Sequence, residues 1–273
     1  MSRLRGYLST TRSVVCIPRP RRIDEFRNPL EFLNGIHDAV EAHGIHFMST
    51  GNIHGNITTH TVCIGAPSGD PTRKGFLIDS PVFNPLFQSA NILSQNTIPT
   101  RKSLPQDYID DLESFYYIIA WVSMAYKAPG KIIPTKRFPR VLACWAAEPD
   151  TREAALNKET LLRSDGFDCR VPGTALFDVP GLPACVIFEA LLGLIHLVLR
   201  HLYAEKWANW DVRTQTYTGK LASPKKVYAT ILDYLRRAAY AMSTSVEPAP
   251  GMEAHGEDGE GGEMWWDKLF TET

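Results

Sequence analysis

The motif that most constrains the fold is a run of acidic and apolar residues near the middle of the chain. Asp110 and Asp111 open the sequence Asp-Asp-Leu-Glu-Ser-Phe, and a strongly apolar segment follows. Its apolar residues are Tyr116, Ile118, Ile119, Trp121 and Val122. Carboxylates are favoured at a helix N-terminus by the helix dipole. We therefore expect a helix that begins near Asp110 and continues through the apolar segment.

Two later segments also carry helix signals. Ala184 to Leu199 is the strongest apolar stretch; it contains Glu189 and His196, is shorter than a membrane span, and so predicts a buried helix. Ser223 is a suitable N-cap and Pro224 suits a first helical turn. Apolar residues then recur on one helical face: Val227, Ile231, Leu235 and Ala238.

Three motifs in a fixed order carry a resemblance to a known family. Ile45 to Ile53 follows a helical run, Gly75 to Asp79 reads Gly-Phe-Leu-Ile-Asp, and Asp110 to Phe115 is the motif above. This order resembles the C-terminal lobe of the fungal-type protein kinases. Their catalytic loop reads His-Arg-Asp-Ile-Ser-x-x-Asn-Ile, their metal-binding segment Gly-x-Leu-Ile-Asp-Phe-Asp, and their next helix opens with Asp-Asp-Leu-Glu-Ser-Phe. The resemblance runs from about Val14 to about Ala204 and implies a mainly α (α+β) fold.

The same resemblance implies that the catalytic base is missing. Kinases supply a carboxylate for the substrate hydroxyl proton, an Asn and an Asp for metal ions, and a Lys for the phosphates. With Asn52 aligned to the metal-binding Asn, Phe47 occupies the position of the catalytic Asp. No Asp or Glu lies between Ala42 and Gly69. Sliding the alignment by one residue therefore supplies no base.

Two candidate metal ligands remain under the resemblance. Asn52 and Asp79 stand at the metal-binding positions, and oxygen ligands suit Mg²⁺, so weak binding of Mg-ATP stays open; no other cofactor is expected. The alternative, which we weight above a metal site, is that Asn52 caps a turn and Asp79 ends a buried strand. Ser80-Pro81 replaces the family's Phe-Asp. The resemblance makes Asp111 a structural residue that holds the catalytic loop, and N-terminal capping alone would favour the same residue type.

The residues before this lobe also depart from the family. A complete kinase carries a small lobe with a glycine-rich loop and a strand Lys. Here a short segment precedes Leu30, Val14 to Pro18 resembles the hinge between the lobes, and neither Gly-x-Gly-x-x-Gly nor Val-Ala-Ile-Lys occurs. The resemblance thus implies a kinase-like C-terminal lobe that lacks most or all of the small lobe. Either the protein is a remnant or the gene model is truncated.

Charge and composition divide the chain into three parts. We predict a basic arm over residues 1–13, a kinase-like lobe over residues 14–242 and an acidic tail over residues 243–273. Residues 247–273 hold eight acids against Lys268, and the Glu-, Gly- and Pro-rich composition predicts disorder. The basic arm has no interleaved aromatic residues, so we do not expect nucleic-acid binding.

An aromatic cluster interrupts the acidic tail. Trp265, Trp266 and Phe270 are flanked by acids, which is typical of short segments that bind a groove on a protein partner. The alternative, which we prefer, is that the cluster docks on its own domain and covers surface that a small lobe would occupy.

Cysteine usage bears on the compartment. Five scattered cysteines without a Cys-x-x-Cys pair predict a reducing, intracellular location, cytoplasmic or nuclear. The histidines match no zinc spacing. No signal peptide opens the chain, and we expect no membrane association.

Three functions remain open. The first is a catalytically inactive kinase-like protein that acts by protein interaction. The second is an active serine/threonine kinase with displaced catalytic groups. The third is a helical interaction module whose kinase resemblance reflects ancestry only. Binding of Mg-ATP separates the first two.

Overall fold

The structure is mainly helical, as the sequence predicts. The computed structural model describes residues 21–65, 74–82, 84–97, 104–146, 151–164, 184–211, 213–219 and 221–244. Its helices are α1 Pro29–Thr50, α2 Ala90–Thr97, α3 Tyr108–Ala125, α4 Arg140–Ala146, α5 Thr151–Arg163, α6 Ala184–Asn209 and α7 Pro224–Thr244. Its strands are β1 Arg21–Arg22, β2 Val62–Ile64, β3 Gly75–Leu77, β4 Tyr126–Ala128, β5 Lys131–Ile132, β6 Trp210–Asp211 and β7 Thr216–Tyr217, and its 3-10 helices are η1 Ile23–Glu25, η2 Pro85–Phe87 and η3 Thr135–Arg137.

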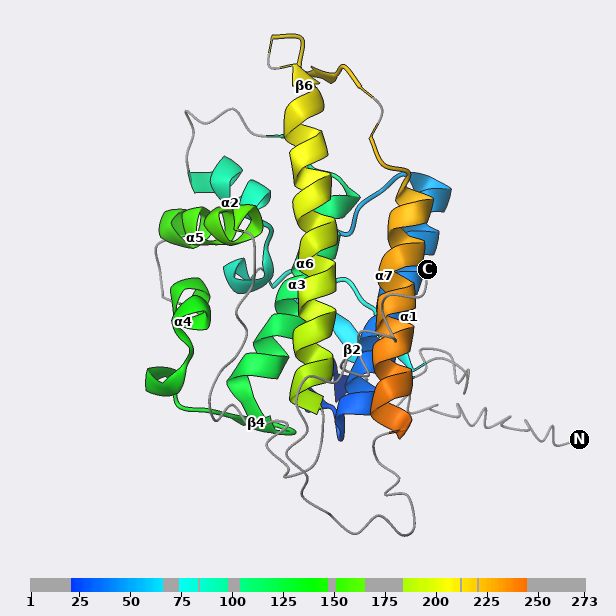
Figure 1. Cartoon of the computed structure of the whole chain (residues 1–273), viewed down its shortest axis with the longest axis vertical. Coiled ribbons are helices and arrows are strands. Elements are labelled where there is room, and N and C mark those ends of the chain that lie inside the picture. The colour runs from blue at the N-terminus through cyan, green and yellow to red at the C-terminus, as the bar shows by residue number, and fades with distance from the viewer. Residues whose placement is uncertain are drawn as a thin grey trace, which may run out of the picture.

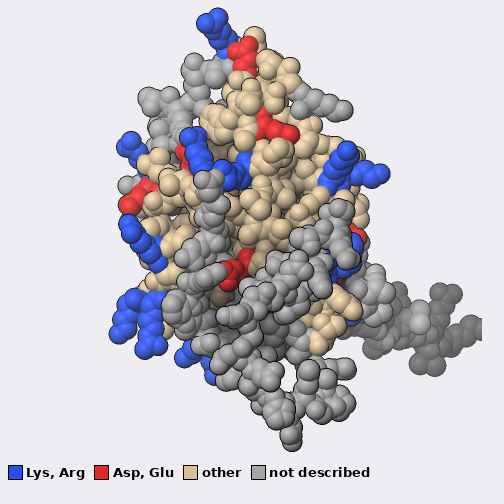
Figure 2. Space-filling view, viewed as in Figure 1, with Lys and Arg blue, Asp and Glu red and all other residues tan. Residues whose placement is uncertain are grey.

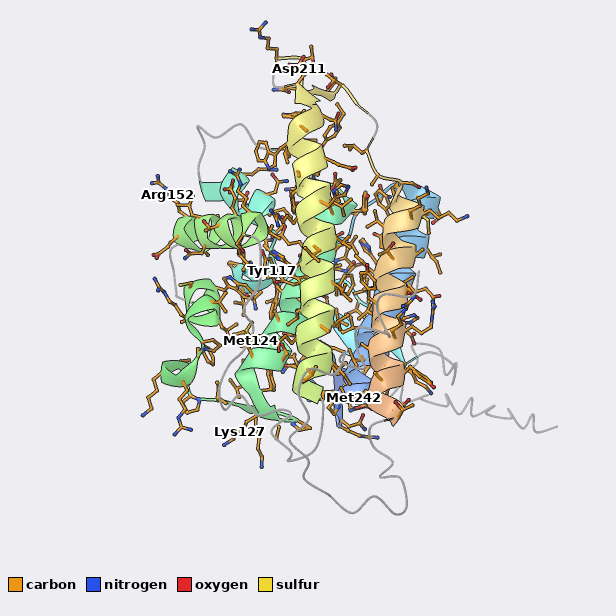
Figure 3. The ribbon with its side chains drawn as sticks, viewed as in Figure 1. Tyr117, Met124, Lys127, Arg152, Asp211 and Met242 are labelled. Atoms are coloured by element: carbon orange, nitrogen blue, oxygen red, sulfur yellow. The ribbon has the colours of Figure 1, made fainter. Side chains whose placement is uncertain are left out.

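Helix α3 is the helix that the acidic motif predicts, and it is buried at the centre of the fold. The Asp107 side chain accepts a hydrogen bond from the Ile109 N–H, and the Asp110 carboxylate accepts one from the Asp107 N–H, so both cap the helix N-terminus. Trp121 is the one partly exposed side chain of α3; all its other residues are buried. Helices α6, α2 and α4 pack against α3, and its Tyr117 lies inside the molecule (Figure 3). A helix apolar on all sides requires such cover.

Helices α1, α6 and α7 lie side by side along the molecule (Figure 1). Gly44 of α1 allows the close approach to α7, because a Cβ there would lie 2.8 Å from a ring carbon of Tyr228. The Asn28 side chain caps the start of α1, and Gly51, with φ 73°, ends it. Helix α7 begins at Pro224 as predicted, and its predicted apolar face is buried.

The predicted start of the catalytic loop at Ile45 is wrong. Helix α1 continues without a break to Thr50, because Ile45 to Thr50 can all adopt helical angles and the first residue that leaves the helix is Gly51 in the left-handed region. The irregular segment therefore begins at Gly51 and ends where β2 begins.

A small antiparallel sheet follows that segment. Its strand order is β1-β2-β3, with Cys63 of β2 opposite Phe76 of β3 and Arg22 of β1. The sheet packs on α1, and the chain leaves β3 toward Asp79. The Ile78 N–H donates a hydrogen bond to the Thr61 carbonyl at 2.9 Å. This bond holds the end of β3 beside the segment from Gly51 to Thr61.

Gly75 permits the closest contact between β3 and α1. A Cβ at Gly75 would overlap the backbone of Gly35, which cannot move without displacing α1. We expect Gly75→Ala to lower the free energy of unfolding by about 1–3 kcal/mol, measured by urea denaturation. Gly193→Ala is the matched control, since no atom lies within 4 Å of its Cβ position in α6; it should raise stability by about 0.5–1 kcal/mol. Equal changes in the free energy of unfolding for Gly75→Ala and Gly193→Ala would contradict a close contact between Gly75 and Gly35.

Helix α6 confirms the predicted apolar helix but is longer than expected. Its 26 residues continue past Leu199 to Asn209. The segment Val186–Asn209 is long and apolar enough to cross a membrane, but half of the apolar window is buried inside the protein. Core helices of soluble proteins have the same composition, so this helix is weak evidence for a membrane span.

On the face in Figure 2, Lys and Arg are more frequent than Asp and Glu among the described residues.

Some predictions concern residues that lie outside the described ranges. They are the basic arm over residues 1–13, the hinge segment from Val14 to Pro18, and the aromatic cluster with Trp265, Trp266 and Phe270. The predicted boundary between lobe and tail at residue 242 falls inside α7, which continues to Thr244.

Candidate functional site

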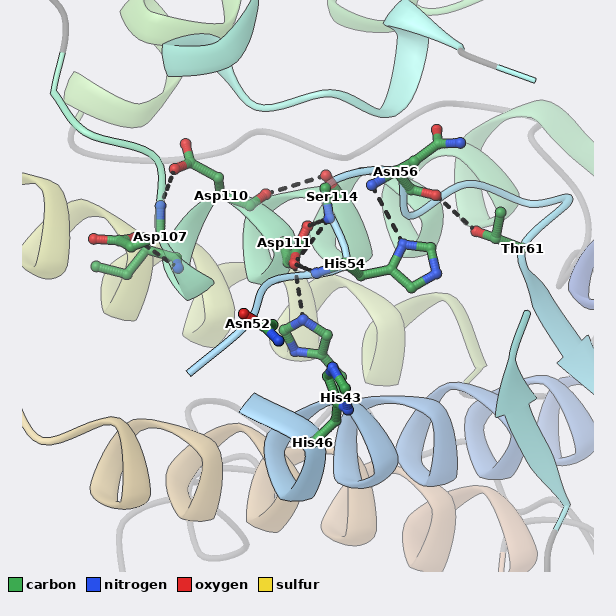
Figure 4. A network of polar contacts seen from close by, with 12 residues as sticks. His43, His46, Asn52, His54, Asn56, Thr61, Asp107, Asp110, Asp111 and Ser114 are labelled. Atoms are coloured by element: carbon green, nitrogen blue, oxygen red, sulfur yellow. Dashed lines mark hydrogen bonds and ion pairs between the residues drawn. The ribbon is translucent and has the colours of Figure 1, made fainter. Parts of the chain in front are cut away.

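Asp111 is the centre of a buried polar network at the start of α3 (Figure 4). Its Oδ2 accepts a hydrogen bond from the His54 backbone N–H at 2.7 Å, and its Oδ1 accepts one from the Gly55 N–H at 2.9 Å. The carboxylate is 1% exposed. Because these donors belong to an irregular segment, Asp111 fixes the position of that segment relative to α3.

His43 connects Asp111 to two other helices. Its Nε2 donates to Asp111 Oδ2 at 2.8 Å, and its Nδ1 lies 2.6 Å from the Tyr228 hydroxyl. Burial raises the pKa of Tyr228, so this hydroxyl keeps its proton and can donate it to Nδ1. The chain Tyr228, His43, Asp111 thus joins α7, α1 and α3 in one network.

The His54 side chain faces the end of β3. Its Nδ1 accepts from the Asn56 N–H at 3.3 Å and its Nε2 lies 3.3 Å from the Ile78 carbonyl oxygen. A neutral ring with the proton on Nε2 satisfies both contacts. The same Nε2 is 3.9 Å from a carboxylate oxygen of Asp79. His54 therefore links the irregular segment to the Asp79 region.

Asn56 holds the chain that follows Asp79. Its Nδ2 donates to the Ser80 carbonyl at 2.8 Å and to the Val82 carbonyl at 3.1 Å. Both N–H groups of the amide are thus used. Its Oδ1 is buried and has no hydrogen-bond partner among the described residues.

Thr61 closes the irregular segment on itself. Its hydroxyl donates to the Asn56 carbonyl at 3.0 Å and accepts from the Thr58 N–H at 2.8 Å. Both functions of the hydroxyl are therefore used within the segment that leads into β2.

The residues that the sequence singles out are not gathered at one point. Phe47 lies in α1 and packs on the Tyr108 ring, with 5.1 Å between centroids. Asn52 is exposed just after Gly51, and its N–H donates to the Thr50 hydroxyl. Asp79 is also exposed. Figure 4 shows Asn52 near the end of α1, apart from the side chains of Asn56 and Thr61.

The donor set near Asp79 is poor for a metal ion. In the described ranges, no three His, Cys, Asp or Glu side chains are arranged to hold a metal. Asp79 offers an exposed carboxylate, and the Asn56 amide oxygen is buried without a hydrogen-bond partner among the described residues, while the hydroxyl of Thr61 is used in local hydrogen bonds. Mg²⁺ is usually bound by one or two protein carboxylates together with waters and substrate phosphates, and among these residues Asp79 alone offers a carboxylate.

A second polar cluster lies deeper, between α3, α5 and α6. Lys158 is fully buried and donates to the carbonyl oxygens of Leu86 at 2.8 Å and Gln88 at 2.6 Å. Glu113 accepts from the Tyr117 hydroxyl at 2.5 Å, from the Tyr203 hydroxyl, and from the Ala90 N–H at 2.8 Å.

Both charged groups of this cluster have shifted pKa values. Burial lowers the pKa of Lys158 to about 7, although the nearby Glu113 opposes this shift. Burial likewise raises the pKa of Glu113 to about 7, against the hydrogen bonds that stabilise its charged form. The hydrogen bonds of Lys158 join α5 to η2, and the hydrogen bond from the Ala90 N–H to Glu113 joins α2 to α3. These contacts hold the helices together.

His54, Asn56 and Thr61 were missed by the sequence interpretation. One signal was present: His54 is followed three positions later by Ile57 and then Thr58, which resembles the spacing of His-Arg-Asp-Ile-Ser. The longer run of weak matches around Asn52 obscured it.

Comparison with known proteins supports the motif-based resemblance. A model of the fungal protein kinase family matches residues 7–123. This segment is less than half of the chain and ends inside α3. It contains Asp111, His43 and the segment from Gly51 to Thr61, but not Tyr228 of α7. The predicted resemblance to the fungal protein kinases is thus confirmed for that part of the chain. Comparisons with curated proteins and with solved structures found no match.

Proposed function

We propose that this protein is a kinase-like C-terminal lobe that does not transfer phosphate and that acts by protein interaction. The family match supports the kinase relationship. The observation that carries the proposal is the pair of hydrogen bonds from the His54 and Gly55 N–H groups to Asp111. These bonds support a new register for the catalytic loop.

The register follows from the role that the resemblance gives to Asp111. In the family, the Asp at the start of this helix accepts hydrogen bonds from the backbone of the catalytic loop. Asp111 accepts them from residues 54 and 55, so His54 and Gly55 align with His-Arg and Asn56 aligns with the catalytic Asp. The following residues then match Ile-Ser-x-x-Asn-Ile as Ile-Thr-Thr-His-Thr-Val. This register replaces the one that placed Phe47 at the base position and Asn52 at the metal position.

The chemistry of the new register argues against phosphoryl transfer. A neutral amide cannot accept the substrate hydroxyl proton as a carboxylate does. The amide protons of Asn56 already bind the Ser80 and Val82 carbonyls. Thr61 stands in place of the metal-binding Asn, and its hydroxyl is used locally. Asp79 is the one retained metal-binding residue, which leaves weak Mg-ATP binding as a secondary proposal.

The other functions are weaker on this geometry. An active kinase with displaced groups requires a carboxylate as catalytic base, and the proposed register places the amide of Asn56 at that position. A plain helical interaction module would not need the hydrogen bonds that join Asp111 to the segment from His54 to Asn56. We also propose, from the sequence, that this protein binds a protein partner and has an intracellular location. We propose no membrane or nucleic-acid binding.

We expect Mg-ATP at millimolar concentration not to raise the melting temperature. A ligand at a hundredfold its Kd would stabilise the folded state by about 2.7 kcal/mol, which calorimetry detects easily. Transfer of radiolabelled phosphate to protein substrates should also stay at the background level. Phosphate transfer that is lost in Asp79→Ala would overturn the proposal, whereas a melting shift that is lost in Asp79→Ala without transfer would support only the secondary proposal of Mg-ATP binding.

The register has its own control, the pair Asn56→Ala and Asn52→Ala. Loss of the Asn56 amide leaves the Ser80 and Val82 carbonyls without this donor, so stability should fall by about 1–2 kcal/mol. Asn52 is exposed, and its replacement should change stability by less than about 0.5 kcal/mol. A larger loss of stability in Asn52→Ala than in Asn56→Ala would instead support the register that places Asn52 at the metal-binding position.

A further inference from the structure

An open cavity lies between α2, α5 and α6, and Asp79 is not among its lining residues. Its volume is about 360 Å³, within the usual range for ligand sites. Apolar and aromatic side chains line most of it, and two Arg and one Glu stand among them. We name it the α2–α5–α6 groove; its principal lining residues are Ala90, Leu162, Arg163, Arg200, Tyr203 and Trp207.

The polar groups of the groove lie at different depths. The Tyr203 hydroxyl is turned to the buried Glu113 and Asp110, so its ring offers an apolar surface to an occupant. Arg163 is 64% exposed and pairs with Glu159 at 2.6 Å. Trp207 is 40% exposed, an uncommon exposure for this side chain in water. The groove thus combines an apolar floor with a rim of net positive charge.

We propose that the aromatic segment of the same chain, Met264 to Phe270, docks in the α2–α5–α6 groove. The segment brings Trp265, Trp266 and Phe270, flanked by Glu263 and Asp267. Arg guanidinium groups stack on Trp rings and pair with carboxylates, so both residue types of the segment suit the rim. Trp and Arg also carry much of the binding energy in protein interfaces.

The segment is able to reach the groove. Met242, near the end of α7, lies toward the end of the molecule where α6 begins (Figure 3). From Ala184 to Arg200, α6 rises about 24 Å. Residues 245–264 separate the end of α7 from Trp265, and an extended chain of that length spans about 65 Å. Docking therefore needs no change in the described helices.

Charge favours this occupant over a neutral one. Residues 247–273 carry eight acids against Lys268, and the rim of the groove has two Arg against Glu159. A tether of this kind gives an effective concentration of ~1 mM. A site with a Kd of ~100 µM for the free segment would then be occupied about tenfold more often than it is empty. This inference is independent of the proposed lack of phosphoryl transfer.

Hydrogen exchange of the full chain tests the docking. The variant Trp265→Ser/Trp266→Ser removes the two largest side chains of the segment and leaves the groove unchanged. We expect the backbone amides of α2 and of residues 200–207 to exchange up to ~10-fold faster in this variant than in the wild type. Tyr240→Ser removes an exposed aromatic side chain of α7 and is the matched control, without effect on those amides. Equal exchange in wild type and double variant would overturn the proposal.

A second measurement locates the site. A fluorescein-labelled peptide of residues 261–273 is added to the Trp265→Ser/Trp266→Ser protein, and anisotropy gives its Kd. Ala204→Trp fills the groove from its exposed wall and Arg163→Glu reverses one rim charge; each should weaken binding at least about tenfold. Leu197→Ala, an exposed change on α6 outside the groove, should leave the Kd unchanged. Binding that Ala204→Trp does not weaken, or that depends instead on the basic arm, would overturn the proposal.

Discussion

Replacing Asp111 with Ala is expected to lower the free energy of unfolding by about 3–5 kcal/mol, the cost of removing one partner from a buried charged network. The change leaves His43 and the N–H groups of His54 and Gly55 without their acceptor. Because Tyr228 binds the other side of His43, the loss also loosens the contact between α1 and α7. Urea denaturation followed by circular dichroism measures this loss.

Two other variants make the result specific. Asp111→Asn keeps the shape and one acceptor oxygen, so its loss should be smaller than that of Asp111→Ala. Asp233→Ala removes a surface carboxylate of α7 that pairs with Arg236 and Arg237. Its effect should stay below about 1 kcal/mol. If Asp111→Ala cost no more than Asp233→Ala, Asp111 would not hold the segment from His54 to Asn56.

The second large effect is a pH dependence of stability that arises from Lys158 and Glu113. Burial lowers the pKa of Lys158 to about 7, from an ordinary value of 10.5. Between these values the unfolded chain binds a proton that the folded protein does not bind. Stability should therefore rise by an amount on the order of 3–5 kcal/mol between pH 7 and pH 10. Lys158→Met should remove this rise.

Glu113 acts on the other side of neutrality. Burial raises its pKa from 4.5 to about 7. In that interval the folded protein holds a proton that the unfolded chain has released, so the contribution of Glu113 to stability falls as pH rises. Glu113→Gln should flatten this part of the curve. Together the two groups predict a stability minimum near pH 7 in the wild type.

Urea denaturation at half-unit steps from pH 4.5 to pH 10 checks both effects. The difference between wild type and Lys158→Met measures the contribution of Lys158 in the presence of Glu113. The difference for Glu113→Gln also contains a further lowering of the Lys158 pKa, because Glu113 raises that pKa in the wild type. Above pH 10 the buried tyrosines reverse the trend, because burial raises the pKa of Tyr117 and Tyr203 and the unfolded chain releases those protons first. A Lys158→Met curve parallel to that of the wild type between pH 7 and pH 10 would refute the shift.

Local patterns predicted several elements well. The acidic motif at Asp110 gave the start of α3 to within a few residues, and the apolar spacing after Pro224 gave α7. Both depend on neighbours within one helix. The end of α1 was missed, because Ile45 to Thr50 has neither a strong helix signal nor a breaker and only Gly51 ends the helix.

The residues of the candidate site were harder to find than its motifs. The sequence interpretation singled out Asp111 and Asp79, since each lies within a recognisable motif. His54, Asn56 and Thr61 were not, because a loop without an Arg-Asp pair offers two possible alignments to the family. The hydrogen bonds from His54 and Gly55 to Asp111 support the alignment that we propose. The two residues of each hydrogen bond are separated by 57 and 56 positions in the sequence, so local patterns do not predict the contact.

The sequence by itself determined that the chain is mainly helical, that it resembles the fungal protein kinases, and that no carboxylate lies between Ala42 and Gly69. These are properties of composition and of short-range order. Only the tertiary structure decided which residue of that interval faces Asp79. The physical reason is that the buried Asp111 carboxylate needs hydrogen-bond donors inside the protein. The segment after α1 supplies them from the backbone of His54 and Gly55. This contact places Asn56 beside the chain that follows Asp79.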